Sequence, residues 1–451
     1  MLDEKMTGAK FGASGMRIAE LRVHSVAIAD PPLRSSYGLH APYALRTIVE
    51  LDGGDGVVGL GETHGGEAIA RVLESLKPKL AGADPFKLLG EIATQLGTKR
   101  AGTSHDRSQT YLVPGENPLD LEARVNSVLE IAALDLIGKS IGKPVCDLLG
   151  ARARGEVAFS AYAFYKHAGG GGEGDDRRED VYGEALTPEG IVKQVEQMIR
   201  EYGFDEVKLK AGVLEPGVEI ETIRQLRAAL GPKVPLRLDP NCAWSVETSV
   251  EIGKALQSDL DDGGYLEDPT ASLAGMAEVR RNLLQAGVQT PLASNVAVTS
   301  FADLPESVRT DAVQIVLCDP HYWGGIRQVQ HLGKVCETFG MGLSMHSNSH
   351  LGVSLMAMAH AAASTPHLMY ACDTHYPWQT AGDEIVEGGR ISFHCGRVRI
   401  PDKPGLGVDL DHDQLARGRE RFAKCSLRKR DDEAEMRKHV DPSWKRILPR
   451  W

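Results

Sequence analysis

The spacing of hydrophobic positions changes near residue 155. Before this point, residues 17–30, 43–51 and 57–62 alternate between apolar and polar positions, and the Gly-rich turn Asp52–Gly56 separates the last two runs. Such alternation, with turn residues between the runs, is typical of strands in an antiparallel meander. The first part of the chain therefore begins with three predicted strands.

A helix is predicted after this meander. Between Leu121 and Leu136 apolar residues recur at spacings of three and four, which places them on one helical face. Strands followed by a cluster of helices indicate an α+β unit. We therefore expect a disordered leader at 1–15 and an N-terminal α+β domain at 16–154.

From residue 155 onward, short apolar strands alternate with amphipathic helices. The predicted strands after the first are Val207–Lys210, Leu236–Asp239, Tyr265–Glu267, Pro291–Ser294, Val313–Leu317, Gly342–Met345 and His367–Tyr370. A repeat of about 25–30 residues per strand and helix is typical of parallel βα units, and about eight such units close a barrel.

We therefore expect an α/β barrel at 155–400 and a C-terminal segment, 401–451, that returns onto the first domain. The alternative is an open doubly wound sheet. It is disfavoured because no Gly-rich dinucleotide-binding loop follows the first strand.

Composition narrows the choice of partners. A net charge of -11 disfavours nucleic acid, which is bound by basic surfaces. No apolar run is long enough to span a bilayer. The seven cysteines are scattered and never form a C-x-x-C motif, which argues against a disulfide framework or a zinc site. We expect a cytoplasmic protein that binds neither nucleic acid nor membrane.

Polar residues occur at the ends of the barrel strands, where buried parallel strands are normally apolar. In chain order they are Lys208, Lys210, Asp239, Glu267, Asn295, Asp319, His346 and Asp373. From Lys210 onward they are about one βα unit apart, so a barrel would bring them together at its C-terminal mouth.

Three of these residues suit a hard metal ion. Asp239, Glu267 and Asn295 offer two carboxylates and one amide oxygen on consecutive strand ends, and Mg²⁺ prefers such oxygen ligands. The alternative is turn chemistry, because Asp239 directly precedes Pro240. The set of three favours a magnesium site.

The remaining polar residues suit acid–base chemistry. Lys208 and Lys210 are two apart and face the same side of a strand, where mutual repulsion and desolvation would lower a lysine pKa. Solvated lysines on an edge strand are the alternative. Asp319 is one unit before His346, so its carboxylate can fix the imidazole tautomer and raise the histidine pKa. A cation between an amine and an imidazole favours removal of a proton next to a carboxylate.

Five motifs extend the argument to a known family. In order along the chain they read Val-Lys-Leu-Lys, Leu-Asp-Pro-Asn, Leu-Glu-Asp-Pro, Ala-Ser-Asn and Met-His-Ser-Asn. Together with His40–Tyr43, Asp373–His375, Pro404–Gly407 and Arg430–Asp432, they resemble the enolase superfamily, and the glucarate dehydratases in particular. The resemblance covers nearly the whole chain from Pro31.

This resemblance implies a modified TIM barrel, (β/α)7β, with an N-terminal α+β capping domain. It implies Mg²⁺-dependent dehydration of a hexaric acid, D-glucarate or a related sugar diacid, by a homo-oligomer. Lys210 and His346 would be acid–base groups on opposite faces of the substrate, and Asp319 would assist His346. Lys208 would stabilise the enediolate, and Asn241 would hydrogen-bond near the reacting carboxylate.

The resemblance also implies a set of substrate-binding residues. They are His40, Thr110, Tyr162, Phe164, Asn348, Asp373, His375 and Arg430. Alternatives stay open for several: Tyr162 and Phe164 alternate with alanines and also fit ordinary barrel packing, and Arg430 lies in a charged run typical of a solvated face.

Three features depart from the family pattern. They are a Gly-rich insertion at 168–184, a long loop at Arg100–Asn117, and Ser349 in place of an expected asparagine. The insertion is expected to be mobile, either as a surface loop or as a lid. Two other functions stay open: an epimerase or racemase that uses the same bases, and an inactive homologue that acts as a partner protein.

Overall fold

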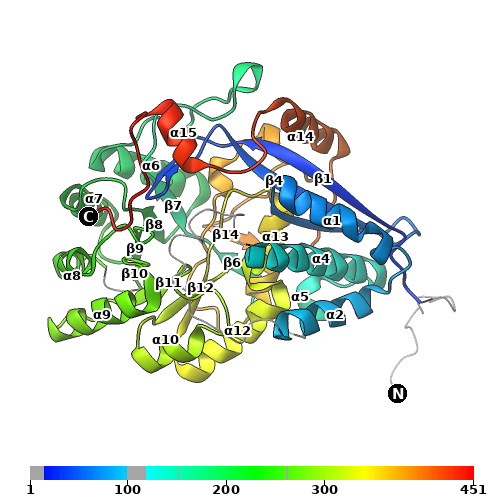
Figure 1. Cartoon of the computed structure of the whole chain (residues 1–451), viewed down its shortest axis with the longest axis horizontal. Coiled ribbons are helices and arrows are strands. Elements are labelled where there is room, and N and C mark those ends of the chain that lie inside the picture. Colours follow the sequence, from blue (N-terminus) through cyan, green and yellow to red (C-terminus); the bar gives the residue numbers. More distant parts are fainter. Residues whose placement is uncertain (1–14, 99–117, 151, 261–262) are drawn as a thin grey trace.

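The computed structural model describes residues 15–98, 118–150, 152–260 and 263–451, so the expected leader falls outside them except for Gly15. The described chain forms a small antiparallel sheet with its own helices beside a curled parallel sheet surrounded by helices (Figure 1). Across the described ranges, none of the helices combines the length and apolar character that crossing a bilayer requires.

The small sheet has the order β1–β4–β5 and is covered by helix α4. Gly59 and Gly61 allow this close packing: a Cβ at Gly59 would lie 2.1 Å from the carbonyl oxygen of Ala132 in α4. The elements of this part are β1 (Glu20–Ala29), β2 (Arg34–Ser35), β3 (Gly38–Leu39), β4 (Tyr43–Asp52), β5 (Val58–His64), α1 (Glu67–Leu80), α2 (Pro85–Thr98), α4 (Pro118–Ile141) and α5 (Val145–Leu148).

The large sheet is parallel and its strands follow one another in chain order from β7 to β13. They are β7 (Ala161–Phe164), β8 (Val207–Lys210), β9 (Leu236–Asp239), β10 (Tyr265–Glu267), β11 (Leu292–Ser294), β12 (Ile315–Cys318) and β13 (Gly342–Met345). From β7 to β12 every strand residue is buried. Burial on both faces explains why these strands are apolar except at a few positions.

Helices connect the strands on the outside of the sheet (Figure 1). They are α6 (Pro188–Tyr202), α7 (Pro216–Leu230), α8 (Val246–Ala255), α9 (Ser272–Gln285), α10 (Leu304–Thr310), α11 (Pro320–Trp323), α12 (Ile326–Phe339) and α13 (Gly352–Ala363). Their ends follow local chemistry: Thr187 caps α6 by accepting the N–H of Gly190, and Gly203 ends that helix in a left-handed conformation.

A short segment, 371–373, joins the two edges of the large sheet. The N–H of Asp373 donates to the carbonyl of Met345 in β13, and the carbonyl of Cys372 accepts the N–H of Ser160, which directly precedes β7. The N–H of Cys372 donates to the carbonyl of Ala158 in β6 (Glu156–Ala158). The predicted strand at His367–Tyr370 is wrong: the residues there form no strand, and Met369 is exposed, although its N–H donates to the carbonyl of Leu343 in β13. With this segment the sheet closes into a modified (β/α)7β barrel.

The C-terminal part packs on the small sheet. After β14 (Arg397–Arg399), which pairs with β6, helix α14 (His412–Lys424) lies on β1, and α15 (Asp432–His439) lies on β3. Gly38 permits the second contact, because a Cβ there would lie 2.2 Å from the carbonyl oxygen of Asp432. This packing brings residues 430–432 next to His40.

The Gly-rich insertion at 168–184 makes specific contacts that a low-complexity sequence does not predict. Asp180 accepts hydrogen bonds from Nζ of Lys166 at 2.7 Å and from the N–H of Gly169 at 2.6 Å. The N–H of Gly172 donates to the carbonyl of Pro42, which belongs to the N-terminal part. Backbone and charge contacts, invisible in a low-complexity sequence, fasten the insertion between the two sheets.

Gly171 packs against the backbone of Asp30 in the N-terminal part, and it provides a test of these contacts. Its φ is +83°, and a Cβ there would lie 2.4 Å from the carbonyl oxygen of Asp30. Gly174 also has a positive φ, +57°, but a Cβ there would meet nothing within 4 Å. We predict that Gly174→Ala costs about 1 kcal/mol from left-handed strain alone, whereas Gly171→Ala lowers the melting temperature considerably more.

Differential scanning calorimetry of the two variants gives the comparison. Equal melting temperatures would contradict the close packing of the insertion on Asp30.

Candidate active site

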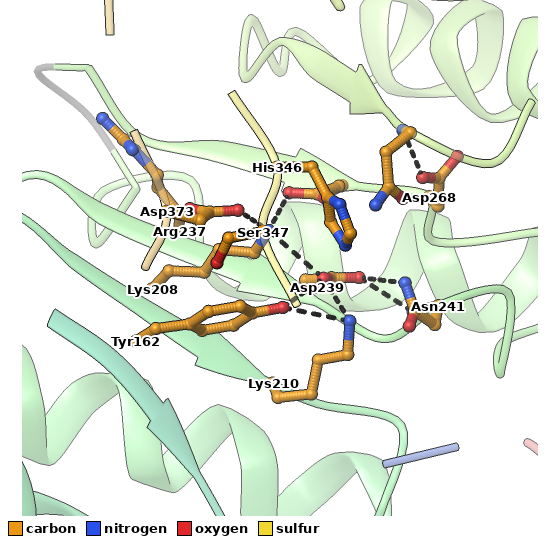
Figure 2. Close-up of polar contacts among 12 residues, drawn as sticks. Tyr162, Lys208, Lys210, Arg237, Asp239, Asn241, Asp268, His346, Ser347 and Asp373 are labelled. Carbon is orange, nitrogen blue, oxygen red and sulfur yellow. Dashed lines mark hydrogen bonds and ion pairs between the residues drawn. The ribbon is translucent and has the colours of Figure 1, made fainter. Parts of the chain in front are cut away.

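The barrel interior holds two lysines and three carboxylates in contact with one another. Figure 2 shows both lysines with Asp239 and Asp373. Nζ of Lys208 lies 2.6 Å from a carboxylate oxygen of Glu267 and 2.6 Å from one of Asp373. Nζ of Lys210 lies 2.7 Å from Oδ2 of Asp239. All five residues are at most 3% exposed. Their charges are therefore compensated by one another rather than by water.

The prediction that repulsion and desolvation lower a lysine pKa is wrong for Lys208. Burial alone would lower its pKa, but the charges of Asp373 and Glu267 outweigh burial and raise the pKa well above its ordinary value. Burial alone would likewise raise the pKa of Asp239, but Lys210 and Lys208 hold it at about 2. Lys208 is thus a fixed cation. Lys210 is the amine at the carboxyl end of β8, nearer to the mouth.

Asp239, Glu267 and Asn295 present oxygen atoms that fit a divalent cation. Oε1 of Glu267 and Oδ1 of Asn295 are buried without a hydrogen-bond partner, and Oε2 of Glu267 faces the ammonium of Lys208 at 2.6 Å. Burial and the neighbouring charge of Asp239 raise the pKa of Glu267 well above its usual range. Among the described residues no three His, Cys, Asp or Glu side chains form a metal-binding group; here the third donor is an amide. Hard oxygen donors of this kind suit Mg²⁺.

Asp268 fixes the loop that presents Asn295. Its Oδ2 accepts the N–H groups of Asn295 at 2.8 Å and Val296 at 3.0 Å, and its Oδ1 accepts the hydroxyl of Ser294 at 2.6 Å. Such supporting contacts orient metal ligands. The role was not predicted, because Asp268 precedes Pro269 and reads as a turn residue.

The predicted contact between His346 and Asp319 is present. Nδ1 of His346 lies 3.2 Å from Oδ2 of Asp319, and because a carboxylate only accepts, Nδ1 carries the proton. Burial would raise the pKa of Asp319, but His321 and His346 outweigh it and hold the pKa far below its ordinary value. His346 and Lys210 lie on opposite sides of Asp239 in Figure 2.

Two adjoining cavities open at the mouth. The first is lined by Asn241, Asn295, Asp319, His346 and Asn348 among others. The second is lined by Asp30, His40, Asn348, Arg430 and Asp432 among others. Asn348 lines both, so a ligand that occupies them would have one end at the candidate metal site and the other at Arg430.

An aromatic cluster stands beside these cavities. The rings of His40 and His375 are stacked with centroids 6.2 Å apart, and Phe164 lies 5.2 Å from His375. Nδ1 of His375 is 3.0 Å from the hydroxyl of Ser347. Both ring nitrogens of His40 are buried without a hydrogen bond. Each of these nitrogens faces a carboxylate of the protein: Nδ1 lies 3.5 Å from Asp30, and Nε2 lies 3.8 Å from Asp432.

The other predicted substrate-binding residues have mixed placements. Arg430 lines a cavity, and its Nε donates to Asp432 at 2.6 Å. The hydroxyl of Tyr162 donates to Oδ2 of Asp239 at 3.2 Å, so it belongs to the charged network. Asp373 is fully buried against Lys208 and lines neither cavity. Thr110 lies outside the described residues.

Comparison with known proteins identifies the two parts of the chain. Residues 18–150 match the family model "Mandelate racemase / muconate lactonizing enzyme, N-terminal domain", and residues 190–414 match "Enolase C-terminal domain-like". A protein of Streptomyces coelicolor named "Probable glucarate dehydratase" is 43% identical over 97% of this chain and 99% of its own length.

Two solved structures are also similar over nearly the whole chain. An enolase from Pseudomonas fluorescens with bound magnesium, potassium and tartrate has a TM-score of 0.88 and 43% identity, covering 97% of this chain and 100% of the other. An enolase from Mycobacterium smegmatis complexed with tartrate has a TM-score of 0.86 and 44% identity, covering 98% and 100%.

Loosening the Asn295 loop should weaken cation binding. We predict that Asp268→Asn lowers Mg²⁺ affinity, measured by isothermal titration calorimetry, about tenfold or more. Asp135→Asn is the matched control, because Asp135 is also fully buried and accepts two backbone N–H groups, those of Leu60 and Leu406, but belongs to α4. Equal affinities in the two variants would contradict the role given to Asp268.

Proposed function

Because this chain belongs to the enolase superfamily, in the family of mandelate racemase and muconate lactonizing enzyme, we propose that it dehydrates a hexaric acid such as D-glucarate with bound Mg²⁺. Family membership and the Streptomyces relative make it an acid-sugar dehydratase, that is, a hydro-lyase. The proposal concerns the six-carbon diacid and the metal ion.

One observation carries the proposal: an amine and an imidazole flank a set of cation-binding oxygens. Lys210 contacts Asp239 from one side, and His346 lines the cavity that also contains Asn295. Mg²⁺ bound by Asp239, Glu267 and Asn295 would polarise the substrate carboxylate and stabilise the charge that develops there.

Lys210 and His346 each carry out one proton transfer. The amine of Lys210 removes the proton from the carbon next to the carboxylate, and Lys208 compensates the added negative charge. Because Asp319 occupies Nδ1 of His346, its protonated Nε2 is the atom that donates to the β-hydroxyl, which leaves as water. The resulting enol becomes a 2-keto-3-deoxy diacid. Asn241, held by its hydrogen bond to Asp239 at 2.7 Å, lines the same cavity.

The second cavity supports a substrate with two acidic ends. Arg430 and His40 lie there, away from the candidate metal site, and a guanidinium is the preferred partner of a carboxylate. Two similar structures contain tartrate, which is also a dicarboxylate, and one of them contains magnesium. The diacid and the metal are inferred from this agreement.

Removal of either acid–base group should stop the reaction without unfolding the protein. We predict that Lys210→Ala and His346→Asn each reduce kcat for dehydration at least ~100-fold, because each deletes a proton-transfer group. Circular dichroism melting of both variants is the folding control. Near-normal turnover in both well-folded variants would contradict the proposed roles.

The substrate is tested with a panel of hexaric acids and tartrate in the presence of Mg²⁺. Keto-acid formation is followed by the absorbance of the semicarbazone. We expect at least one hexarate to be dehydrated and the activity to disappear after exhaustive chelation and return with Mg²⁺. A change in optical rotation without a keto-acid would instead identify an epimerase, which the same pair of bases would also serve. Full activity after chelation would contradict the metal site.

A further inference from the structure

Asp319 contacts two imidazoles, and the proposed reaction uses only one of them. Its Oδ2 lies 3.2 Å from Nδ1 of His346, and its Oδ1 lies 2.7 Å from Nδ1 of His321. Asp319 and His321 are each at most 3% exposed. His321 lies behind the carboxylate, where no part in proton transfer to a substrate has been given to it.

His321 fixes the orientation of the Asp319 carboxylate. Asp319 caps the short helix α11, so Oδ1 accepts the backbone N–H of His321 at 2.8 Å as well as its ring Nδ1–H. Two donors on one oxygen prevent the carboxylate from rotating, and Oδ2 is thereby left facing His346. The dyad geometry thus depends on a residue that does not touch His346.

Ser354 sets the tautomer of His321. Nδ1 must carry a proton because it faces a carboxylate, and Nε2 lies 3.1 Å from the hydroxyl of Ser354 on α13. When that hydroxyl donates to Nε2, the contact holds the ring of His321 in the Nδ1–H form. Besides Asp319, the titratable groups near His321 include His64, whose ring centroid is 6.4 Å away, and Glu62, whose carboxylate accepts the N–H of Ser354 at 2.8 Å.

We propose that His321 and Ser354 are positioning residues that act on His346 through Asp319. They hold one carboxylate oxygen so that the other keeps the proton of His346 on Nδ1, which leaves Nε2 for the substrate. The kinetic consequence rests on the proposed dehydratase function, whereas the tautomer of His346 does not.

Three substitutions separate this role from simple packing. His321→Phe removes the ring donor, His321→Asn replaces it with an amide N–H near the position of Nδ1, and Ser354→Ala removes the contact to Nε2. Ser364→Ala is the matched control, because Ser364 is equally buried at the end of α13 and donates only to the carbonyl of Ala361. The melting temperature of each variant reports on folding.

The first measurement is the long-range ¹H–¹⁵N spectrum of the ¹⁵N-histidine-labelled protein without substrate. We expect neutral His346 to be the Nδ1–H tautomer in the unaltered protein, in Ser364→Ala and in His321→Asn. In His321→Phe, and to a smaller extent in Ser354→Ala, the Nε2–H tautomer should appear. This result does not depend on whether the enzyme dehydrates any hexarate.

The second measurement is steady-state kinetics with the substrate identified by the panel. His321→Phe should lower kcat about tenfold or more while KM changes little, since the orienting group of a histidine base affects proton transfer rather than binding. An unchanged His346 tautomer in both His321→Phe and Ser354→Ala would overturn the proposal, whatever the kinetics. If His321→Phe fails to fold, Ser354→Ala alone decides by the same spectrum.

Discussion

Two ammonium groups and three carboxylates share a barrel interior that water does not reach, and the balance of their charges governs the rest of the site. When Asp239, Glu267 and Asp373 are all ionised, Lys208 and Lys210 leave one of their three negative charges uncompensated. Isolated charges of this kind are costly to bury, so the arrangement favours a bound cation. With a divalent cation and an unprotonated Lys210 the five side chains and the ion reach neutrality, which leaves the site able to receive added negative charge on the substrate.

The fold places these charged groups and the candidate cation site at one end of the barrel. Each ligand ends a different strand or directly follows one, so the spacing between them is set by the parallel sheet rather than by mobile loops. Three further features complete the region around the C-terminal end of the barrel. Asp268 holds the Asn295 loop, Arg430 of the C-terminal segment lines a cavity there, and the insertion packs on Asp30. The reacting groups are thus supported by elements from every part of the chain.

Much of the barrel could be predicted from sequence because parallel strands are short, apolar and regularly spaced. The polar exceptions at Lys208, Asp239, Glu267 and His346 stood out against that background, and the strand order brought them together. The prediction failed where the signal was not periodic. The sequence His367–Tyr370 has the apolar character of a strand. In the folded chain, however, the segment that joins the two edges of the large sheet is 371–373, and its position cannot be read from apolar character alone. The insertion looks disordered, although the N–H of Gly172 donates to Pro42, a residue distant in sequence, and Asp180 binds Lys166 just before the insertion.

Supporting residues were missed for a related reason. Neither Asp268 nor His321 belongs to a recognisable sequence pattern. Asp268 precedes a proline, and His321 lies in the short helix α11 directly after Asp319. Their roles depend on hydrogen bonds that only the folded chain reveals. The direction of the Lys208 pKa was also mistaken, because the sequence showed the neighbouring lysine but not the distances to three carboxylates.

The convergence of these groups on one cation is tested most directly by crystals of the protein grown with Mn²⁺ in place of Mg²⁺. An anomalous difference map should show one strong peak about 2 Å from oxygens of Asp239, Glu267 and Asn295, with Lys210 and His346 on either side of it. A map with the manganese bound elsewhere, or with these three side chains directed away from one another, would contradict the account.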